Sequence, residues 1–462
     1  MYKKTQKIHF VGIGGIGMSG IAELLITLGY EVSGSDLSDS ATTRKLQSLG
    51  GKVYQGHDGR WVQGADVVVT SSAIRDDNPE VVTALEAGIP VIPRAEMLAE
   101  LMRLKKYGIA IAGSHGKTST TSMVSWMMAE ADLDPTIVVG GKIDSLGGNA
   151  KLGHGEFLVA EADESDASFL KLSPALEVVT NIDLEHMDYY HDINHIKNTF
   201  LEFIDRIPFY GAVILCLDDE NVADILPRIR KRKITYGFSA QADLSAEQIQ
   251  PGNGRVKFSV RHGEDVLGEI DLSLPGRHNV YNALAAICVG LELSIPFNTI
   301  SKALSSFQGV QRRMQCKGEG RGISVLDDYG HHPTEIRATL SAIKEGWPEK
   351  RLVVLFQPHR YSRTLALLSE FRTCFHQADF LVMTEIYAAS EKPDETISGE
   401  ILLDEVIKHG QRQTRFVSKV EDLAEALLPE LKKGDLVLTL GAGNIVLAGE
   451  DLVTLLQKSK ND

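Results

Sequence analysis

The chain has 462 residues, of which 43% are hydrophobic and 24% are charged, and its formal net charge at pH 7 is −14. A single hydrophobic core stops growing near about 250–300 residues, so the length predicts several domains. The negative charge argues against a nucleic-acid or anionic-membrane partner, and no apolar stretch approaches the roughly 18 residues of a membrane span. The four cysteines are widely spaced, which argues against a zinc or disulfide framework and favours reduced thiols in a cytoplasmic protein.

Residues 7–106 alternate short apolar runs with amphipathic stretches of helix length, which predicts a parallel, doubly wound α/β sheet. The first run, IHFVGIG, leads into a G-x-G-x-x-G pattern made by Gly12, Gly14 and Gly17. Such a turn lets a diphosphate approach the amide groups at a helix N-terminus. In an NAD-dependent dehydrogenase, Asp36 would be the acid that binds the ribose.

A second α/β segment follows MRLKKYG, with the strand IAIAG, the loop SHGKTS and the helix TTSMVSWMMAEA. This order predicts a phosphate cradle in which Lys117 faces the β and γ phosphates and Thr118 or Ser119 offers a hydroxyl to Mg²⁺. Ile111 stands where a strict P-loop has its first glycine, so we expect a shortened loop. A plain helix cap is the competing interpretation.

The next strand end is acidic. VAEADESDASF places Glu161, Asp163, Glu164 and Asp166 where ligand sites of α/β sheets lie. Four carboxylates this close predict a bound cation, most simply Mg²⁺, and Glu161 is the leading candidate because it is nearest the strand. A solvated acidic loop is the alternative, above all for Asp166.

A third strand end, TNIDLEHMDYYHDINH, supplies Asn181, Glu185, His186 and Asp188. The histidines of this segment have no regular zinc spacing. His186 becomes a candidate because its strand is expected to lie beside the glycine-rich loop.

The rest of the chain repeats the α/β pattern. The central segment continues through LEVVTNID and GAVILCLDDE, with a small antiparallel annex predicted at VKFSVRH and EIDLSLPG. Beyond it, ISVLDDYGHHPTE, RLVVLFQPHRYSR, FLVMTEIYAA and DLVLTLGAGN place strands with polar ends ahead of helices. The sequence thus predicts three consecutive α/β domains: a Rossmann-like one over 1–106, a P-loop ATPase-like one over 107–312 and a Rossmann-like one over 313–462.

These motifs together resemble the ATP-dependent Mur ligases of peptidoglycan synthesis. They run in that family's order, from GIGGIGMSGIAE, VSGSD, SSAIRDDNPE and PRAEMLAELMR through GSHGKTSTT, EADESDASFL and TNIDLEHMD to GRHNVYNALAA, DDYGHHPTE and QPHRYSR. The resemblance implies a UDP-sugar domain, a central ATPase and a C-terminal amino-acid domain. It also implies that ATP phosphorylates the lactyl carboxylate of UDP-N-acetylmuramate and that L-alanine attacks the acyl phosphate, with release of ADP and phosphate.

The resemblance also implies which residues bind the nucleotides. For ATP they are Gly113, Ser114, His115, Gly116, Lys117, Thr118, Ser119, His278, Asn279 and Asn282, with helix capping as the competing role of Asn279. For the UDP-sugar they are Gly14, Gly15, Ile16, Gly17, Met18, Ser19, Asp36, Ser71, Ser72 and Arg94.

Metal and amino-acid contacts follow from the same resemblance. Thr118 and Glu161 would lie around one Mg²⁺ ion and His186 around a second. The amino acid would meet Tyr329, His331, Arg360 and Arg363, with solvated surface arginines as the alternative. The expected catalytic set is Lys117, Glu161, His186, His331 and Arg360.

One departure from the family concerns a carbamoylated lysine that several Mur ligases carry after the histidine motif. Alignment of HMDYYHDINHIKNTF puts Phe200 at that position, and Lys197 is nearly a turn away. We therefore expect no carbamoyl-lysine, as in the alanine-adding branch.

Other functions explain less of the sequence. A dehydrogenase leaves GSHGKTSTT and the acidic strand end unexplained, and a kinase or P-loop switch protein leaves the first glycine pattern and the third domain without a role. A sister ligase that adds another amino acid, or a recycling ligase that adds a peptide, is the nearest alternative. SSAIRDDNPE and DDYGHHPTE favour alanine, and we expect a monomer or a weak homodimer without nucleic-acid or membrane partners.

Overall fold

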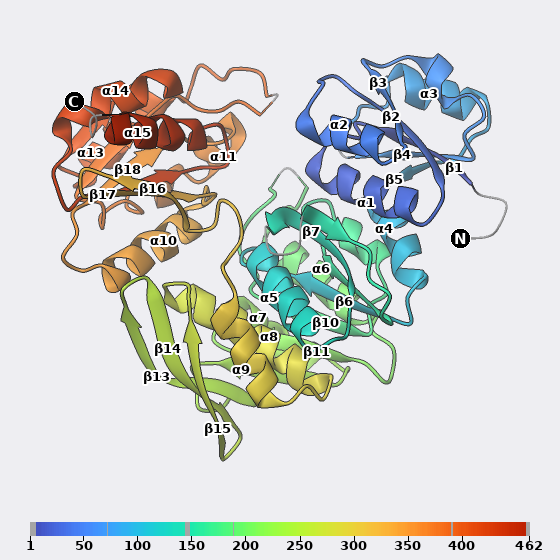
Figure 1. Cartoon of the computed structure of the whole chain (residues 1–462), viewed down its shortest axis with the longest axis horizontal. Coiled ribbons are helices and arrows are strands. Elements are labelled where there is room, and N and C mark those ends of the chain that lie inside the picture. Colours follow the sequence, from blue (N-terminus) through green and yellow to red (C-terminus); the bar gives the residue numbers. More distant parts are fainter. Residues whose placement is uncertain (1–5, 72, 144–147, 188, 390, 459–462) are drawn as a thin grey trace. The chain divides into compact units, whose positions relative to one another are not determined.

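The computed structural model describes residues 6–71, 73–143, 148–187, 189–389 and 391–458. It contains three sheets, coloured blue, teal to yellow, and orange to red in Figure 1. The contacts divide the chain into two units. One comprises Met1–Glu247, Ser259–Ile270 and Tyr281–Phe307, and the other Gln248–Phe258, Asp271–Val280 and Gln308–Asp462. No helix among the described residues is both long and apolar enough to cross a membrane.

The first sheet has the strand order β3-β2-β1-β4-β5, and all its neighbouring pairs are parallel. This is the Rossmann order, so a ligand crevice is expected at the carboxyl ends of β1 and β4, where the order reverses. The elements are β1 (Lys7–Val11), α1 (Ile16–Thr27), β2 (Glu31–Asp36), α2 (Ala41–Ser48), β3 (Lys52–Gln55), β4 (Val67–Thr70), α3 (Pro79–Glu86), β5 (Val91–Pro93) and α4 (Arg94–Arg103).

The central sheet has the order β15-β14-β13-β12-β11-β10-β6-β9-β7-β8. β6 pairs in parallel with β9 on one side and β10 on the other. Its strands are β6 (Tyr107–Ala112), β7 (Thr136–Ile143), β8 (Gly148–Lys151), β9 (Phe157–Glu161), β10 (Leu176–Val179), β11 (Ala212–Cys216), β12 (Lys233–Gly237), β13 (Leu244–Gly252), β14 (Arg255–His262) and β15 (Asp265–Leu272). Its helices are α5 (Lys117–Glu130), α6 (Ile193–Ile204), α7 (Glu220–Ile225), α8 (Arg277–Glu292) and α9 (Phe297–Ser306).

The third sheet has the order β16-β17-β21-β18-β19-β20, with only β16 antiparallel to its neighbour. Separate hydrophobic clusters cover its two faces, one with α10 and α13 and the other with α14 and α15. The elements are β16 (Gln315–Gly320), β17 (Ile323–Asp328), α10 (Pro333–Gly346), β18 (Leu352–Phe356), α11 (Tyr361–Ala366), α12 (Leu368–Phe371), β19 (Phe380–Met383), α13 (Gly399–Lys408), β20 (Thr414–Phe416), α14 (Leu423–Leu427), β21 (Leu436–Leu440) and α15 (Val446–Lys458). The predicted fold class, consecutive α/β segments built on three sheets, is confirmed.

One hydrophobic cluster runs through both the first sheet and the central sheet. It includes Phe10 and Leu24 of the first and Leu158 and Phe200 of the central segment. Helix α1 packs on β7 and β8, and Asn149 donates a hydrogen bond to the carbonyl of Ile16 at 2.6 Å. The first two predicted domains therefore share a core.

A carboxylate lies inside the central sheet without a partner. Glu177 of β10 is fully buried, its register partners are Ala110 and Val213, and neither carboxylate oxygen has a hydrogen-bond partner among the described residues. Burial raises the pKa of this carboxyl group well above its usual value. The folded chain therefore holds a proton that an unfolded glutamate releases once the pH exceeds about 4.3.

We expect Glu177→Met to stabilise the protein. A methionine of similar size removes the buried polar group, worth about 1–3 kcal/mol, and the gain should grow as pH rises because the wild type alone must hold the extra proton. Denaturant midpoints at pH 5 and pH 8 check this. Glu177→Gln, which keeps a polar group but cannot titrate, should lose the pH dependence with a smaller gain. A wild type that is relatively more stable at pH 8 would contradict the prediction.

Candidate active site

The second glycine-rich loop lies between β6 and α5. Gly113 has φ +129° and Gly116 has φ +80°, and a Cβ at Gly113 would lie 2.1 Å from Oγ1 of Thr180. Both positions thus require glycine. Gly116 is the N-cap residue of α5, and as a glycine it supplies no side-chain capping bond. The first amides of α5 are available to an anion.

The loop is attached to the end of β10. The amide of His115 donates to Oδ1 of Asn181 at 2.8 Å, and the carbonyl of His115 accepts from Nδ2 of Asn181 at 3.0 Å and Oγ1 of Thr180 at 2.6 Å. Oγ of Ser114 accepts from the amide of Asp183 at 2.8 Å. Asn181 and Asp183 therefore shape the loop, a role that the sequence did not reveal.

Lys117 starts α5 and bends back over the loop. Its Nζ donates to the carbonyls of Gly113 at 2.6 Å and Ser114 at 3.0 Å and to Oε1 of Glu164 at 2.7 Å. Burial lowers the pKa of this amine, but the charges of Glu164 and Glu161 outweigh it and raise the pKa above its usual value. Lys117 is therefore a fixed positive charge.

Thr118 and Glu161 meet across the sheet edge. Oγ1 of Thr118 donates to both carboxylate oxygens of Glu161, at 3.1 and 3.0 Å, and Oε2 of Glu161 also accepts from the amide of Gly140 at 2.9 Å. The hydroxyl and the carboxylate predicted to share one Mg²⁺ ion are thus neighbours. Ser119 follows in the first turn of α5.

His186 lies beside two acids that do not include Glu161. Its Nε2 is 3.6 Å from Oε1 of Glu164 and 3.8 Å from Oε2 of Glu185, and its backbone has φ +56°. Burial lowers the pKa of this imidazole, while Glu164 and Glu185 raise it to a net value above the usual one. Glu164, which the sequence ranked below Glu161, is the acid shared by His186 and Lys117.

Glu164, Glu185 and His186 offer three ligand atoms within 4.8 Å of one another. Glu164 is buried, and its Oε2 has no hydrogen-bond partner among the described residues. Tyr190 fixes this turn by donating its hydroxyl to the carbonyl of Glu164 at 2.5 Å. Mg²⁺ prefers oxygen ligands, so the hydroxyl of Thr118 and the carboxylates of Glu161, Glu164 and Glu185 fit that ion, and His186 adds one nitrogen donor.

The first glycine turn is held by Asp36. Oδ2 of Asp36 accepts from the amide of Gly14 at 2.8 Å, and Oδ1 accepts from Ser38. Gly15 is the N-cap residue of α1 without a side-chain capping bond, which leaves the first amides of α1 open to an anion. Asp36 thus has a local structural role that needs no ribose.

The other predicted sugar-nucleotide residues are distributed around this turn. Ile16 is exposed, whereas the side chains of Met18 and Ser19 are buried, so a ligand could meet these two only through the backbone. Ser71 is half-buried, and Ser72 lies outside the described residues. The guanidinium of Arg94 lies against Gly17.

The predicted amino-acid residues of the second unit form one cluster. Tyr329 follows β17, and the guanidinium groups of Arg312 and Arg313 lie over its ring, with guanidinium carbons 5.0 and 5.3 Å from the ring centre. The ring of His331 is 5.4 Å from that of Tyr329 and 5.8 Å from that of His359. Cationic and aromatic groups therefore converge at the ends of β17 and β18.

His359 was not among the predicted residues although it lies in QPHRYSR. Its Nδ1 is 3.2 Å from Nη1 of Arg363. Burial lowers the pKa of His359 to about 3, with His331, Arg363 and Arg360 acting in the same direction, so the ring is neutral and accepts from Arg363. Arg360 has φ +69°, and its Nε is 3.8 Å from Oε1 of Glu391.

The residues predicted to bind adenine belong to both units. Asn282 accepts from Oγ1 of Thr120 at 3.1 Å, and a Cβ at Gly116 would lie 2.6 Å from its Oδ1, so Asn282 adjoins the glycine-rich loop. Asn279, the third residue of α8, donates to the carbonyl of Pro275 at 2.8 Å. Burial lowers the pKa of His278 to about 4.

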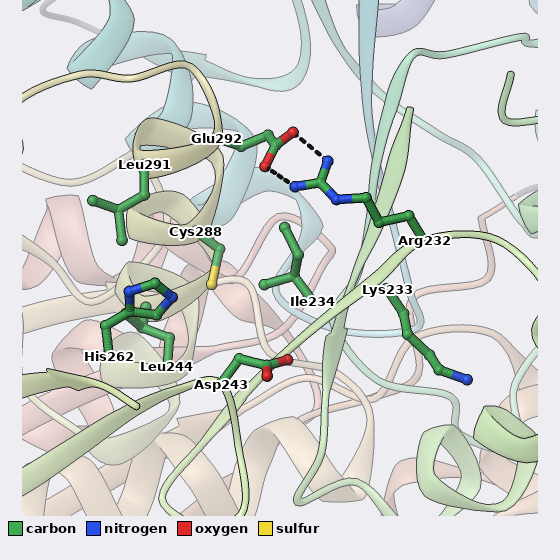
Figure 2. Close-up of a pocket in the computed structure, with 9 residues that line it drawn as sticks. All are labelled: Arg232, Lys233, Ile234, Asp243, Leu244, His262, Cys288, Leu291 and Glu292. Atoms are coloured by element: carbon green, nitrogen blue, oxygen red, sulfur yellow. Dashed lines mark hydrogen bonds and ion pairs between the residues drawn. The ribbon is translucent and has the colours of Figure 1, made fainter. Parts of the chain in front are cut away.

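A cavity of about 310 Å³ lies elsewhere in the central segment (Figure 2). It contains a two-pronged ion pair between Arg232 and Glu292, with N–O distances of 2.5 and 2.6 Å. None of the predicted site residues is among those that line it, which are Arg232, Lys233, Ile234, Asp243, Leu244, His262, Cys288, Leu291 and Glu292.

The position that the resemblance aligns with a carbamoylated lysine is apolar here. Phe200 is fully buried, and its ring meets that of Phe169 edge to face at 5.2 Å. Nζ of Lys197 pairs with Asp224 at 3.0 Å. Neither side chain lies among the described contacts of Glu164 or His186.

Comparison with known proteins identifies the family. The profiles described as Mur ligase family, catalytic domain; Mur ligase middle domain; and Mur ligase, glutamate ligase domain match residues 7–106, 111–290 and 312–443. The UDP-N-acetylmuramate--L-alanine ligase of Desulfotalea psychrophila is 68% identical over 99% of both chains.

Solved structures support the same family assignment. The crystal structure of the UDP-N-acetylmuramate-alanine ligase from Thermotoga maritima matches with a TM-score of 0.84 and 31% identity, over 98% of this chain and 99% of that one. A murein peptide ligase from Psychrobacter arcticus shares the fold, with a TM-score of 0.73 and 24% identity over 98% of each chain. The chain belongs to the Mur ligase family.

Proposed function

We propose that this protein joins L-alanine to the lactyl carboxylate of UDP-N-acetylmuramate at the expense of ATP. The observation that carries the proposal is the meeting of Lys117, Thr118, Glu161 and His186 at one edge of the central sheet. The 68% identical relative that is named for this activity supports the choice of substrates. The enzyme is thus an ATP-dependent acid–amino-acid ligase that acts in peptidoglycan precursor synthesis.

The chemical difficulty lies in bringing a carboxylate to the γ-phosphate. Two unit charges at 4 Å repel by about 1 kcal/mol in water and by several-fold more in a site of lower dielectric. Lys117 is positioned to offset this repulsion by exchanging the carbonyls of Gly113 and Ser114 for phosphate oxygens. Two Mg²⁺ ions, held by Thr118 and Glu161 and by His186 with Glu164, would neutralise further phosphate charge.

The amides at the two uncapped helix ends receive the two nucleotides. The start of α5, with Gly113, Ser114, His115, Gly116 and Ser119, takes the triphosphate, and His278, Asn279 and Asn282 remain the proposed adenine contacts. The start of α1 takes the pyrophosphate of the UDP-sugar, with Arg94 beside it. Asp36, Ser71 and Ser72 remain proposed contacts of the same ligand.

The second unit orients the amino acid. Arg363 and Arg360 would hold the alanine carboxylate, and Tyr329 and His331 would flank the amine that attacks the acyl phosphate. A neutral His359 supports this assignment, because it orients the guanidinium of Arg363 without competing for the anion.

We expect Arg363→Lys to raise the KM for L-alanine about tenfold while the KM for ATP stays nearly constant. Lysine keeps the charge but loses the planar fork that matches a carboxylate. Steady-state kinetics with each substrate varied in turn measure both constants. Arg372→Lys, at an arginine of the same unit that pairs with Glu405 at 2.8 Å, is the control and should change neither constant. Equal rises in both constants for Arg363→Lys would contradict the assignment.

The domain boundaries at residues 106 and 312 are part of the proposal. The three matched ranges, 7–106, 111–290 and 312–443, support them. A cytoplasmic location and a monomeric or weakly dimeric state also remain predictions, to be checked by fractionation and by light scattering.

One assay separates the candidate reactions. Purified protein with UDP-N-acetylmuramate, ATP and Mg²⁺ should release phosphate only when L-alanine is added. Phosphate release with L-alanyl-γ-D-glutamyl-meso-diaminopimelate or with another amino acid instead would assign the protein to a sister activity. No phosphate release with any acceptor would overturn the proposal.

A further inference from the structure

A salt bridge connects the first glycine turn to the loop after β9, residues 162–167, which we call the acidic loop. Arg94 begins α4, and its Nη2 donates to Oδ2 of Asp163 at 2.7 Å. The same guanidinium lies against the first turn of α1, where a Cβ at Gly17 would be 2.9 Å from Nη1 of Arg94. The guanidinium of Arg94 therefore contacts both the turn proposed for the UDP-sugar and the loop beside the triphosphate site.

Arg94 is placed to meet an anion at the start of α1. The amides there have no side-chain cap, and the guanidinium next to Gly17 adds a positive charge. A guanidinium fork binds a phosphate as well as a carboxylate. A pyrophosphate at this helix end would therefore compete with Asp163 for the side chain of Arg94.

Asp163 is in turn linked to the triphosphate site. Its Oδ1 accepts from the amide of Ser165 at 3.1 Å, and the next residue, Glu164, holds Nζ of Lys117 at 2.7 Å. Burial raises the pKa of Asp163, but Arg94, Ser165 and Lys117 together hold it below its usual value. Two adjacent carboxylates thus each bind one cation, Arg94 on one side and Lys117 on the other.

We propose that the Arg94–Asp163 salt bridge couples the two nucleotide sites, so that each ligand strengthens the binding of the other. This inference rests on the proposed function. The cation that accompanies the triphosphate would lie beside Glu164 and Asp163, where its positive charge competes with Arg94 for Asp163 and releases the guanidinium to the pyrophosphate. A pyrophosphate that takes Arg94 leaves the negative charge of Asp163 unpaired, which favours a cation-bearing triphosphate beside it.

Coupling of this kind must be reciprocal, because it is a free energy shared by two binding equilibria. Asp163 acts through Arg94 and touches no reacting atom, so it is a positioning residue. Its removal should strengthen one ligand rather than weaken both, which a merely structural residue would not do.

Calorimetric titration of the full chain tests the inference. The Kd of UDP-N-acetylmuramate is measured alone and with saturating Mg²⁺ and β,γ-methylene-ATP, and the reverse titration is also made. In the wild type each ligand should tighten the other by about fivefold or more. In Asp163→Asn the UDP-sugar alone should bind as tightly as it does to the nucleotide-saturated wild type. Neither ligand should then change the Kd of the other.

A neighbouring ion pair supplies the matched control. Glu96 of α4 pairs with Lys171 of the 3₁₀ helix Ser168–Lys171 at 3.5 Å, so Glu96→Gln breaks another link between the same two segments. This variant should keep the full mutual effect. Arg94→Lys keeps the charge but loses the guanidinium fork, so it should reduce the change in Kd that each ligand causes in the other. If Asp163→Asn does not fold, this variant alone tests the coupling.

The outcomes separate the inference from the proposed function. If the wild type binds both ligands and Asp163→Asn or Arg94→Lys retains the full mutual effect, the coupling role is overturned while the proposed function stands. The role is also overturned if the wild type shows no mutual effect or if Glu96→Gln abolishes it. If the wild type does not bind UDP-N-acetylmuramate at all, the proposed function itself fails.

Discussion

Lys117→Ala should lower turnover about 10³-fold or more while the protein stays folded. Nζ of Lys117 is the positive charge that lies on the glycine-rich loop and contacts Glu164. Without it, the carboxylate that attacks the γ-phosphate meets uncompensated negative charge. Phosphate release under saturating substrates measures the loss, and circular dichroism with thermal unfolding checks the fold.

A second lysine makes the control for this variant. Nζ of Lys105 donates to the carbonyls of Gly153 at 2.6 Å and Gly155 at 2.9 Å, so it binds a loop in the same manner but faces no proposed phosphate site. Lys105→Ala should keep near-normal kcat at 25 °C. Near-normal turnover of Lys117→Ala would remove the assignment of the glycine-rich loop to the γ-phosphate.

Glu161→Gln should lower activity about 10²–10³-fold at a fixed Mg²⁺ concentration and raise the Mg²⁺ needed for half-maximal rate. The amide can still accept from Thr118 and Gly140, so the local structure should persist, but it lacks the negative charge that holds a divalent cation. Rates measured across a Mg²⁺ series separate weaker metal binding from a slower chemical step.

The other end of the same strand supplies its control. Glu156 precedes β9 and pairs with Lys106 at 3.2 Å on the surface, so Glu156→Gln removes an equal charge far along the strand. It should leave the Mg²⁺ dependence unchanged. An unchanged Mg²⁺ dependence in Glu161→Gln would instead point to Glu164 as the main ligand.

The sequence predicted the fold because its signals were local. Apolar runs, glycine turns and polar strand ends recur at short spacing, and they marked β1, β6, β9 and β10 with their following loops. Placing β6 between β9 and β10 then brings the glycine-rich loop, the acidic loop and the His186 segment to one sheet edge. The neighbourhood of these three segments was therefore predictable.

The contacts between individual side chains could not be predicted from the sequence. Which acid faces Lys117 depends on how the 162–168 turn is folded, and the choice of Glu161 over Glu164 rested only on distance from the strand. The structure puts Glu161 against Thr118 and Glu164 against Lys117 and His186. His359 was missed for a similar reason, because only burial and its contact with Arg363 distinguish it from a surface histidine.

Arg94 and Asp163 lie 69 residues apart in the chain, and no local pattern links them. Their contact arises from the packing of α4 near the acidic loop. Such long-range ion pairs can be found only once the tertiary structure is known.

The core shared by the first two sheets makes their unfolding cooperative. Side chains from Ile8 to Ile229 belong to one apolar cluster, so loosening either sheet exposes apolar surface of the other. Segments that share a core in this way lose their structure as one cooperative body. A fragment that ends at residue 106 would therefore expose apolar side chains that the central sheet normally covers, and it should tend to aggregate. Truncation at that residue is not expected to give a stable sugar-nucleotide domain.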